Sequence, residues 1–162
     1  MWGINCIYII IIYLIVTLFT FVLMGNNIYH RISFKDVNFA IQQVQFGSFI
    51  IINTLPINQQ QCLIKNTLPC EKEEATINDL LINNKDINII VYGKNANDVT
   101  VEKKCSQLCQ IGFKNIYCYA GGLYHWLLHQ DIYGEDNFPT TSKCSDMLMY
   151  KECDHFTTCL LK

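Results

Sequence analysis

Nine cysteines are the residues of this chain most able to do chemistry, because a thiolate can act as a nucleophile or a metal ligand. Their number is odd and their spacing is irregular, unlike the disulfide framework of a small secreted protein. Reduced cysteines commonly serve as small hydrophobic residues of a core. We therefore expect reduced thiols, with several of them packed in the interior. The nine are Cys6, Cys62, Cys70, Cys105, Cys109, Cys118, Cys144, Cys153 and Cys159.

Histidines and carboxyl-terminal cysteines are the candidate metal ligands. His125 and His129 are four residues apart and could share one helical face. No glutamate between them completes a zincin-like motif, and no third ligand is evident, so we interpret them as a partly exposed pair. The carboxyl-terminal candidates lack the usual Cys-x₂₋₄-Cys spacing, and we predict neither a metal site nor a cofactor. They are Cys144, Cys153, His155 and Cys159.

Segments typical of strands alternate with segments typical of helices. The strand candidate Phe49–Ile52 is a continuous apolar run, as in a parallel sheet that is covered on both faces. Between the strand candidates, apolar residues recur at helical spacing. Strands joined by helices indicate right-handed crossovers and a small three-layer α/β domain with a parallel sheet. The predicted strands are Phe49–Ile52, Ile87–Tyr92 and Ile116–Tyr119, with a short one around Leu63–Leu68, and the helices cover 34–45, 71–84, about 99–111 and 123–130.

The loop after the strand at 87–92 is the predicted binding site. Parallel sheets bind ligands at the carboxyl ends of their strands, and this loop leads into a helix. Backbone amides before a helix amino terminus favour anions. Lys94 could assist such binding, whereas Asp98 would partly oppose it. We expect an anion or a partner protein to bind at Gly93, Lys94, Asn95, Ala96, Asn97 and Asp98.

The order of these segments resembles the rhodanese-like domain family from about Ile32 to Pro139. Phe49–Asn53 resembles the second strand of that family, and 89–117 resembles its strand, active loop, helix and following strand. Gly121-Gly122 followed by Trp126 resembles the signature that closes the family pattern. The resemblance implies a rhodanese-like domain over residues 31–141 and a site in the loop that begins at Gly93.

Departures from the family pattern decide the expected activity. In active sulfurtransferases of the family, a cysteine that carries a persulfide stands at the position of Gly93. Glycine has no nucleophile, so no persulfide can form there. Related phosphatases hold oxyanions with a loop arginine, and this loop offers only Lys94. Asn53 and Leu55 stand where the family usually has Asp and Arg. We expect a catalytically inactive module that acts in protein or anion binding.

An alternative function remains open at this point. A divergent thiosulfate sulfurtransferase, or another thiol-dependent enzyme, could use Cys118 or Cys105 in place of the missing thiol. Cys118 lies within a predicted strand, and Cys105 lies with Cys109 on the core side of a predicted helix. Burial raises a thiol's pKa and blunts its reactivity, so we interpret all three as core residues.

The amino-terminal residues 1–24 form a hydrophobic segment. No charge occurs before Arg31, and Ile7–Leu23 is close to the ~20 apolar residues that a membrane-spanning helix needs. The positive charges of Arg31 and Lys35 then predict a membrane anchor with the domain facing the cytoplasm. If translation starts at Met24, the protein is cytosolic instead. A cleaved signal peptide fits less well, because the segment has no basic start and no small-residue cleavage site.

The charge balance limits the partners. A formal net charge of −2 without any basic stripe argues against nucleic acid. The remaining predicted partners are the membrane, through residues 1–24, and another protein or a small anion. Residues 142–162 are predicted to form an irregular extension.

Overall fold

The computed structural model describes residues 29–152, and segments 1–28 and 153–162 lie outside this range. The predicted membrane anchor, the start at Met24 and the ligand candidates Cys153, His155 and Cys159 therefore fall outside the described residues. Between residues 29 and 152, no helix has both the length and the apolar character that crossing a bilayer requires.

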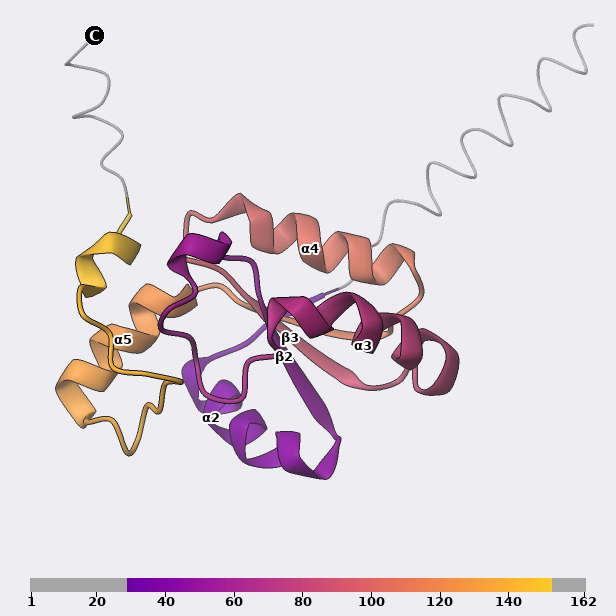
Figure 1. Ribbon diagram of the computed structural model, residues 1–162. Coiled ribbons are helices and arrows are strands. Elements are labelled where there is room, and N and C mark those ends of the chain that lie inside the picture. The colour runs from indigo at the N-terminus through magenta and orange to yellow at the C-terminus, as the bar shows by residue number, and fades with distance from the viewer. Residues whose placement is uncertain (1–28, 153–162) are drawn as a thin grey trace, which may run out of the picture.

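Four parallel strands form the sheet in the described part of the chain: β1 (His30–Arg31), β2 (Phe49–Asn53), β3 (Asn88–Tyr92) and β4 (Asn115–Tyr119). Their order is β1-β4-β3-β2, so β3 and β4 are central (Figure 1). In this register Ile90 pairs with Ile51 on one side and with Tyr117 on the other. The predicted parallel sheet is confirmed.

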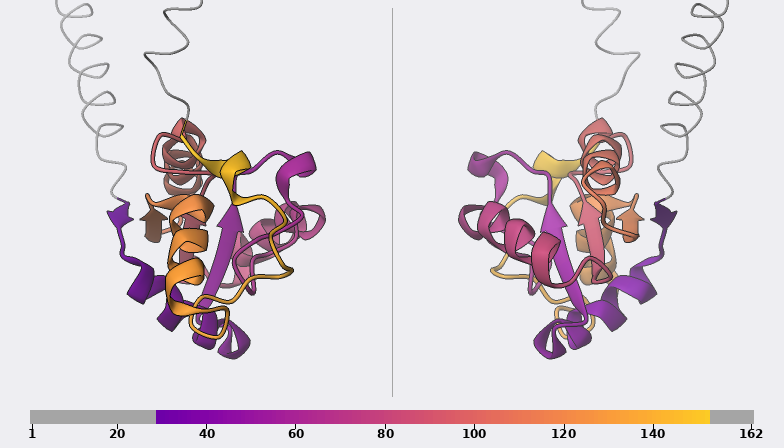
Figure 2. Two further views of the ribbon diagram at one scale, coloured as in Figure 1. Left: turned by 90° about the vertical axis from the view of Figure 1, so that its left-hand side faces the viewer. Right: turned by 90° about the vertical axis from the view of Figure 1, so that its right-hand side faces the viewer.

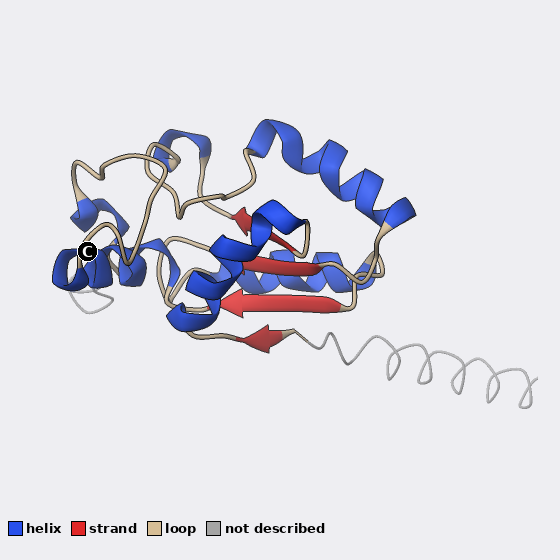
Figure 3. Cartoon of the chain, turned by 90° about the horizontal axis from the view of Figure 1, so that it is seen from below, coloured by secondary structure: helices blue, strands red, loops and turns tan. Residues whose placement is uncertain are grey.

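Helices cover both faces of the sheet, which gives three layers (Figures 1 and 3). The helices α2 and α5 pack on one face, and α3 and α4 pack on the other. Residues 29–152 also contain three short 3₁₀ helices, with η1 and η2 in connections and η3 in the carboxyl-terminal extension. The bounds are α2 (Phe34–Gln43), η1 (Val44–Phe46), η2 (Ile57–Gln59), α3 (Cys70–Asn83), α4 (Val99–Gln110), α5 (Gly122–Tyr133) and η3 (Met147–Tyr150).

Successive residues of β3 enter opposite halves of the core. Ile89 and Val91 pack against α3 and α4, whereas Ile90 and Tyr92 pack against α2 and α5. Side chains alternate between the two faces of a strand, so a strand covered on both sides must be apolar at every position. This arrangement explains the continuous apolar runs in the sequence.

The predicted strand around Leu63–Leu68 is wrong in extent. Only isolated bridges occur there, from Thr67 to Ile51 and from Ile64 to Thr140. Asn66 interrupts the extended chain with a φ of 64°, a left-handed conformation that asparagine tolerates. Its side-chain amide donates to the Ile41 carbonyl at 2.9 Å, which fixes the turn against α2.

The described part of the carboxyl-terminal extension packs over the sheet's carboxyl edge (Figure 2). The sequence predicts an irregular tail, yet η3 forms within it and buries Tyr150. The Tyr150 hydroxyl donates to the Gln59 carbonyl of η2 at 3.1 Å. Two segments that are about 90 residues apart in sequence thus meet above the strand ends.

Candidate functional site

The loop Gly93–Asp98 joins β3 to α4 at the carboxyl edge of the sheet, as predicted. Its backbone is fixed from α5, because Leu123 N donates to the Gly93 carbonyl at 2.9 Å and Tyr124 N donates to the Lys94 carbonyl at 3.0 Å. Gly122 makes this approach possible: it has a φ of 63°, and a Cβ there would lie 2.7 Å from the Gly93 carbonyl oxygen. The Gly-Gly pair of the sequence therefore positions the loop.

Asp98 turns its carboxylate into the loop. Its Oδ2 accepts from the Lys94 backbone amide at 2.8 Å, and its Oδ1 accepts from the Thr100 amide at 3.0 Å. The second bond caps the amino terminus of α4, where a negative charge is stabilising. Amides that could hold an external anion are thus engaged by the chain's own carboxylate. The sequence suggested only that Asp98 opposes an anion.

Gly93 has no room for a side chain. A Cβ built on it would lie 2.4 Å from Asp98 Oδ2 and 2.5 Å from Val101 Cγ2. Non-bonded carbon atoms normally approach to about 3.5–4.0 Å, so any side chain here must displace Asp98. The loop therefore leaves no room for a side chain at the position where the resemblance to the rhodanese-like family places the nucleophile.

The carboxyl-terminal extension is fastened to the loop by two asparagines. Buried Asn95 donates from Nδ2 to the carbonyls of Tyr150 and Lys151, at 2.9 and 3.1 Å. Asn97 donates to Glu152 Oε2 at 3.1 Å. Asn95 Oδ1 also accepts from the Asn97 amide at 3.1 Å, which holds the loop in a tight turn. These two predicted site residues thus serve the internal structure, whereas Ala96 is exposed.

The other two departures from the family pattern lie at the end of β2. Asn53 is buried, and its Oδ1 accepts from the Leu55 amide at 3.0 Å. Leu55 is itself buried in the core beside α2 and α5. Both side chains are turned away from solvent, so neither offers a charge to a ligand.

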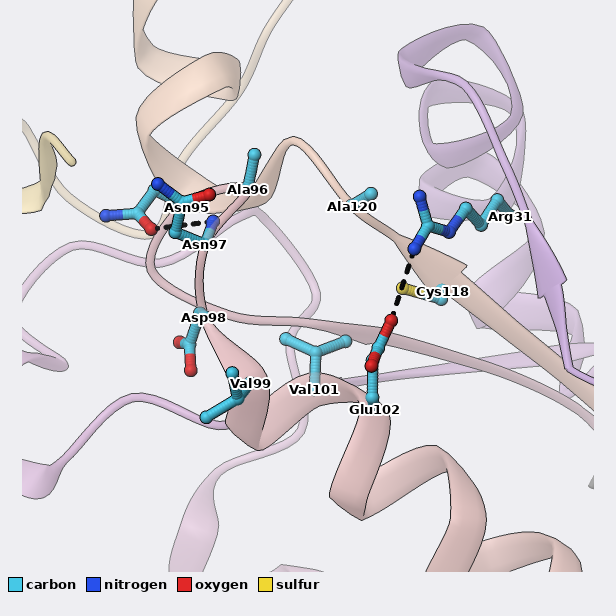
Figure 4. A pocket seen from close by; sticks show the side chains of 10 residues that line it. All are labelled: Arg31, Asn95, Ala96, Asn97, Asp98, Val99, Val101, Glu102, Cys118 and Ala120. Carbon is cyan, nitrogen blue, oxygen red and sulfur yellow. Dashed lines mark hydrogen bonds and ion pairs between the residues drawn. The ribbon is translucent and has the colours of Figure 1, made fainter.

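A first pocket of about 380 Å³ opens between the loop and β1 (Figure 4). Cys118 of β4 lines it, together with Arg31, Glu102 and the loop residues 95–98. Arg31 and Glu102 form an ion pair of 3.1 Å between two largely exposed side chains. Figure 4 shows Cys118, Arg31 and Glu102 around the same pocket. One of the two alternative cysteines thus reaches the pocket beside the loop.

Cys105 lies next to Cys118 in the core half that contains α3 and α4. Hydrogen bonding between the two thiols lowers the pKa of Cys118 and raises that of Cys105. Arg31 further lowers the pKa of Cys118, while burial and Glu102 oppose this shift. Cys118 is 3% exposed and Cys105 is fully buried, so the predicted core packing of both is confirmed. Cys109 is partly buried beside them.

A second pocket of about 400 Å³ lies on the other side of the loop. Lys94 of the loop and Lys151 of the extension both line it. The hydroxyls of Thr54 and Thr100, which are joined by a hydrogen bond of 2.7 Å, add polar groups. Sequence reasoning found Lys94 but missed Lys151, because no local pattern places the extension here.

The histidine pair forms part of an aromatic cluster on α5. His125 Nδ1 is 2.7 Å from the Tyr119 hydroxyl, and His129 Nδ1 is 2.9 Å from the His125 carbonyl. Phe34 and Phe138 pack against the His129 ring. Burial, followed by the charge of His129, lowers the pKa of His125. Among residues 29–152, no group of three or more potential ligands could hold a metal ion.

Fold and site together define a parallel three-layer α/β domain whose site loop contains no cysteine. Among solved structures with a similar fold is the BH2092 protein of Bacillus halodurans, which is 14% identical with a TM-score of 0.53. The match covers 81% of this chain and 89% of that one. At such identity the likeness shows the fold alone.

Rhodanese-like domains of the Alr3790 protein from Anabaena sp. are also among the similar structures, and two of them serve as examples. One is 21% identical with a TM-score of 0.39, covering 58% of this chain and 99% of that one. The other is 23% identical with a TM-score of 0.42, covering 59% of this chain and 82% of that one. The parallel sheet of this chain, with its order β1-β4-β3-β2, is the kind of α/β sheet that the sequence predicts. No protein-family model matches the chain, and no curated protein sequence matches it.

Proposed function

We propose that this protein is a catalytically inactive rhodanese-like module that binds a partner protein through the carboxyl edge of its sheet. The observation that carries the proposal is the state of the loop: Gly93 supplies no nucleophile, and the Asp98 carboxylate takes two of the amides that would hold a substrate anion. Nucleophilic sulfur transfer needs a thiolate at that position. What the loop edge retains is a surface for binding.

Exposed apolar side chains around the loop support a protein partner. Ile57 of η2 is 79% exposed, Val99 of α4 is 77% exposed and Leu148 of η3 is 62% exposed. They come from three elements that meet at the same edge (Figure 2). Lys94 and Lys151 lie in the pocket between them. This combination suits a partner protein that presents an apolar segment and a carboxylate. Such a partner would satisfy both expectations from the sequence, the binding of a protein and the binding of an anion.

Site-specific photocrosslinking in cells that express the full chain tests this proposal. A photoreactive amino acid is placed at Ile57, Val99 or Leu148, one position at a time. Ile82 and Ile132 serve as matched controls, because they are comparably exposed but lie near the carboxyl ends of α3 and α5, at the opposite edge. We expect a shared crosslinked species at the loop edge alone. Equal crosslinking at both edges, or none at the loop edge, would contradict the proposal.

The alternative is sulfur transfer through Cys118, and one observation favours it over Cys105. Cys118 lines the pocket beside the loop, near Arg31, whereas Cys105 lies behind it. Mass spectrometry after thiosulfate treatment separates the two functions. The inactive module gives no persulfide on either thiol, whereas an adduct at Cys118 supports the enzyme.

Membrane attachment through residues 1–24 stays a prediction of the sequence and is part of the proposal. The full chain and a chain that begins at Met24 are expressed in parallel and fractionated. We expect the full chain in the membrane fraction and the shorter chain in the soluble fraction. Full recovery of both chains in the soluble fraction would contradict membrane attachment.

A further inference from the structure

Two thiols beside the loop belong to different elements and meet in the core. Cys105 belongs to α4 and Cys118 belongs to β4, and each thiol shifts the pKa of the other. Both residues belong to the same core cluster. Only 12 residues separate them, so little chain needs to be ordered before the sulfurs can react.

One of the two thiols has access to solvent through the first pocket. Cys118 lines this pocket, and Cys105 does not. Arg31 and Glu102 line the same pocket and form an ion pair with each other (Figure 4). Exposed ion pairs contribute only about 0–1 kcal/mol, so this pair is easily separated when a small molecule enters the pocket. The positive charge of Arg31 also favours a thiolate at Cys118.

From this geometry we infer that Cys118 and Cys105 form a peroxide-sensitive dithiol that converts reversibly to a disulfide. The Cys118 thiolate attacks one oxygen of hydrogen peroxide, the O–O bond breaks, and a sulfenic acid and hydroxide result. The Cys105 sulfur then attacks the Cys118 sulfur, the S–O bond breaks, and the oxygen leaves as water with the Cys105 proton. The hydroxide becomes water on protonation. Two thiols and one peroxide thus give one disulfide and two waters, and a small dithiol reductant reverses the change.

Oxidation of these two cysteines would affect the loop Gly93–Asp98. A disulfide between the two residues would tie α4 to β4 directly beneath the pocket, and α4 begins with the residues that hold Asp98 in the loop. Oxidation of the pair therefore acts on the position of the loop. This inference does not rest on the proposed protein-binding role.

Peptide mapping of the reduced full chain after stoichiometric hydrogen peroxide tests the inference. Trypsin cleaves after Lys104 and Lys114, so Cys105 and Cys118 fall in different peptides, but Cys109 shares the first of them. The experiment therefore uses Cys109→Ser as its background. We expect the 105–114 and 115–143 peptides to become linked, and the link to disappear on reduction. Cys70, partly exposed on α3, is the reference for non-specific oxidation.

Single variants give the decisive controls. In Cys105→Ala, Cys118 has no resolving thiol, and a dimedone adduct should accumulate on it; in Cys118→Ala no linked peptide should form. Glu102→Gln removes both the ion pair with Arg31 and a negative charge that raises the pKa of Cys118, and we expect oxidation to become about two- to fivefold faster. Oxidation of Cys70 without a linked peptide, or an unlabelled Cys118 in Cys105→Ala that still has the native circular dichroism spectrum, would overturn the inference.

Discussion

Adding one methyl group at Gly93 tests whether the Asp98 carboxylate fills the loop. In Gly93→Ala the new Cβ would lie 2.4 Å from Asp98 Oδ2 and 2.5 Å from Val101 Cγ2. The carboxylate is held by two backbone amides, so it cannot swing aside without losing both hydrogen bonds. Overpacking of a close-packed site costs about 1–3 kcal/mol. We expect a loss of about 2–3 kcal/mol in the free energy of unfolding, at the upper end of that range, because two atoms overlap.

Asp98→Ala provides the second arm of a double-mutant cycle. Alone it removes the cap of α4, at a cost of about 1 kcal/mol, and leaves the Lys94 amide without its acceptor. In the double variant the overlap at Gly93 persists only with Val101. The methyl group should therefore cost less, and we expect a coupling free energy of about 1–2 kcal/mol.

The assay is urea denaturation of the full chain, followed by circular dichroism, for the wild type and the three variants at one pH. Distant residues give additive effects within about 0.5 kcal/mol. If the effects of Gly93→Ala and Asp98→Ala add to within that margin, Asp98 does not fill the space beside Gly93, and the description of a closed loop is wrong.

Three further predictions concern the contacts around the loop. Asn95→Ala should speed amide hydrogen exchange in residues 147–152 and lower the free energy of unfolding by about 1–3 kcal/mol, because the carbonyls of Tyr150 and Lys151 lose a buried donor. Asn97→Ala, at an exposed position, should change both quantities less. Tyr92→Phe removes the hydroxyl that accepts from the buried Ile64 amide, and we expect the free energy of unfolding to fall by about 1–3 kcal/mol. Tyr133→Phe, at an exposed position, should lower it by under about 0.5 kcal/mol. Equal losses in the two variants would contradict the stabilising role of this buried hydrogen bond. The pKa of His125 is lowered below 6.5 in the folded protein, so the contribution of neutral His125 to the free energy of unfolding is complete above pH 6.5 and is lost as the pH falls through the lower folded pKa. In urea denaturation, the free energy of unfolding should therefore fall more steeply between pH 7 and 5 in the wild type than in His125→Gln. Parallel curves for the two proteins would contradict this.

The layers of the fold were predictable because they follow from local patterns. The three confirmed strands were predicted from segments that are apolar except at Asn88, namely Phe49–Ile52, Ile87–Tyr92 and Ile116–Tyr119. Such segments in a βαβ context have few other solutions. The predicted start of α2 is confirmed, and a capping box stabilises it, in which the Ser33 amide donates to Asp36 at 2.8 Å. The helix ends two residues earlier than the sequence predicts, since η1 continues it in a tighter form.

The contents of the site were only partly predictable. The loop and its missing nucleophile could be located from sequence, because Gly93 follows a buried strand directly. The inward turn of Asp98 had one local signal: it precedes the helix that begins at Val99, where aspartate is a favoured cap. No local signal in the sequence shows that Lys151 lines the second pocket, or that Arg31 and Cys118 line the first pocket together. Both arrangements depend on packing between segments that are far apart in the chain.

Thiocyanate formation from thiosulfate and cyanide tests most directly the central claim that this site has no working nucleophile. The full chain and Cys118→Ala are compared with an uncatalysed reaction, and native circular dichroism confirms that both are folded. We predict the same background rate in all three, because the loop has no thiol at Gly93. A rate above background that disappears in Cys118→Ala would show that the pocket thiol has taken over the chemistry.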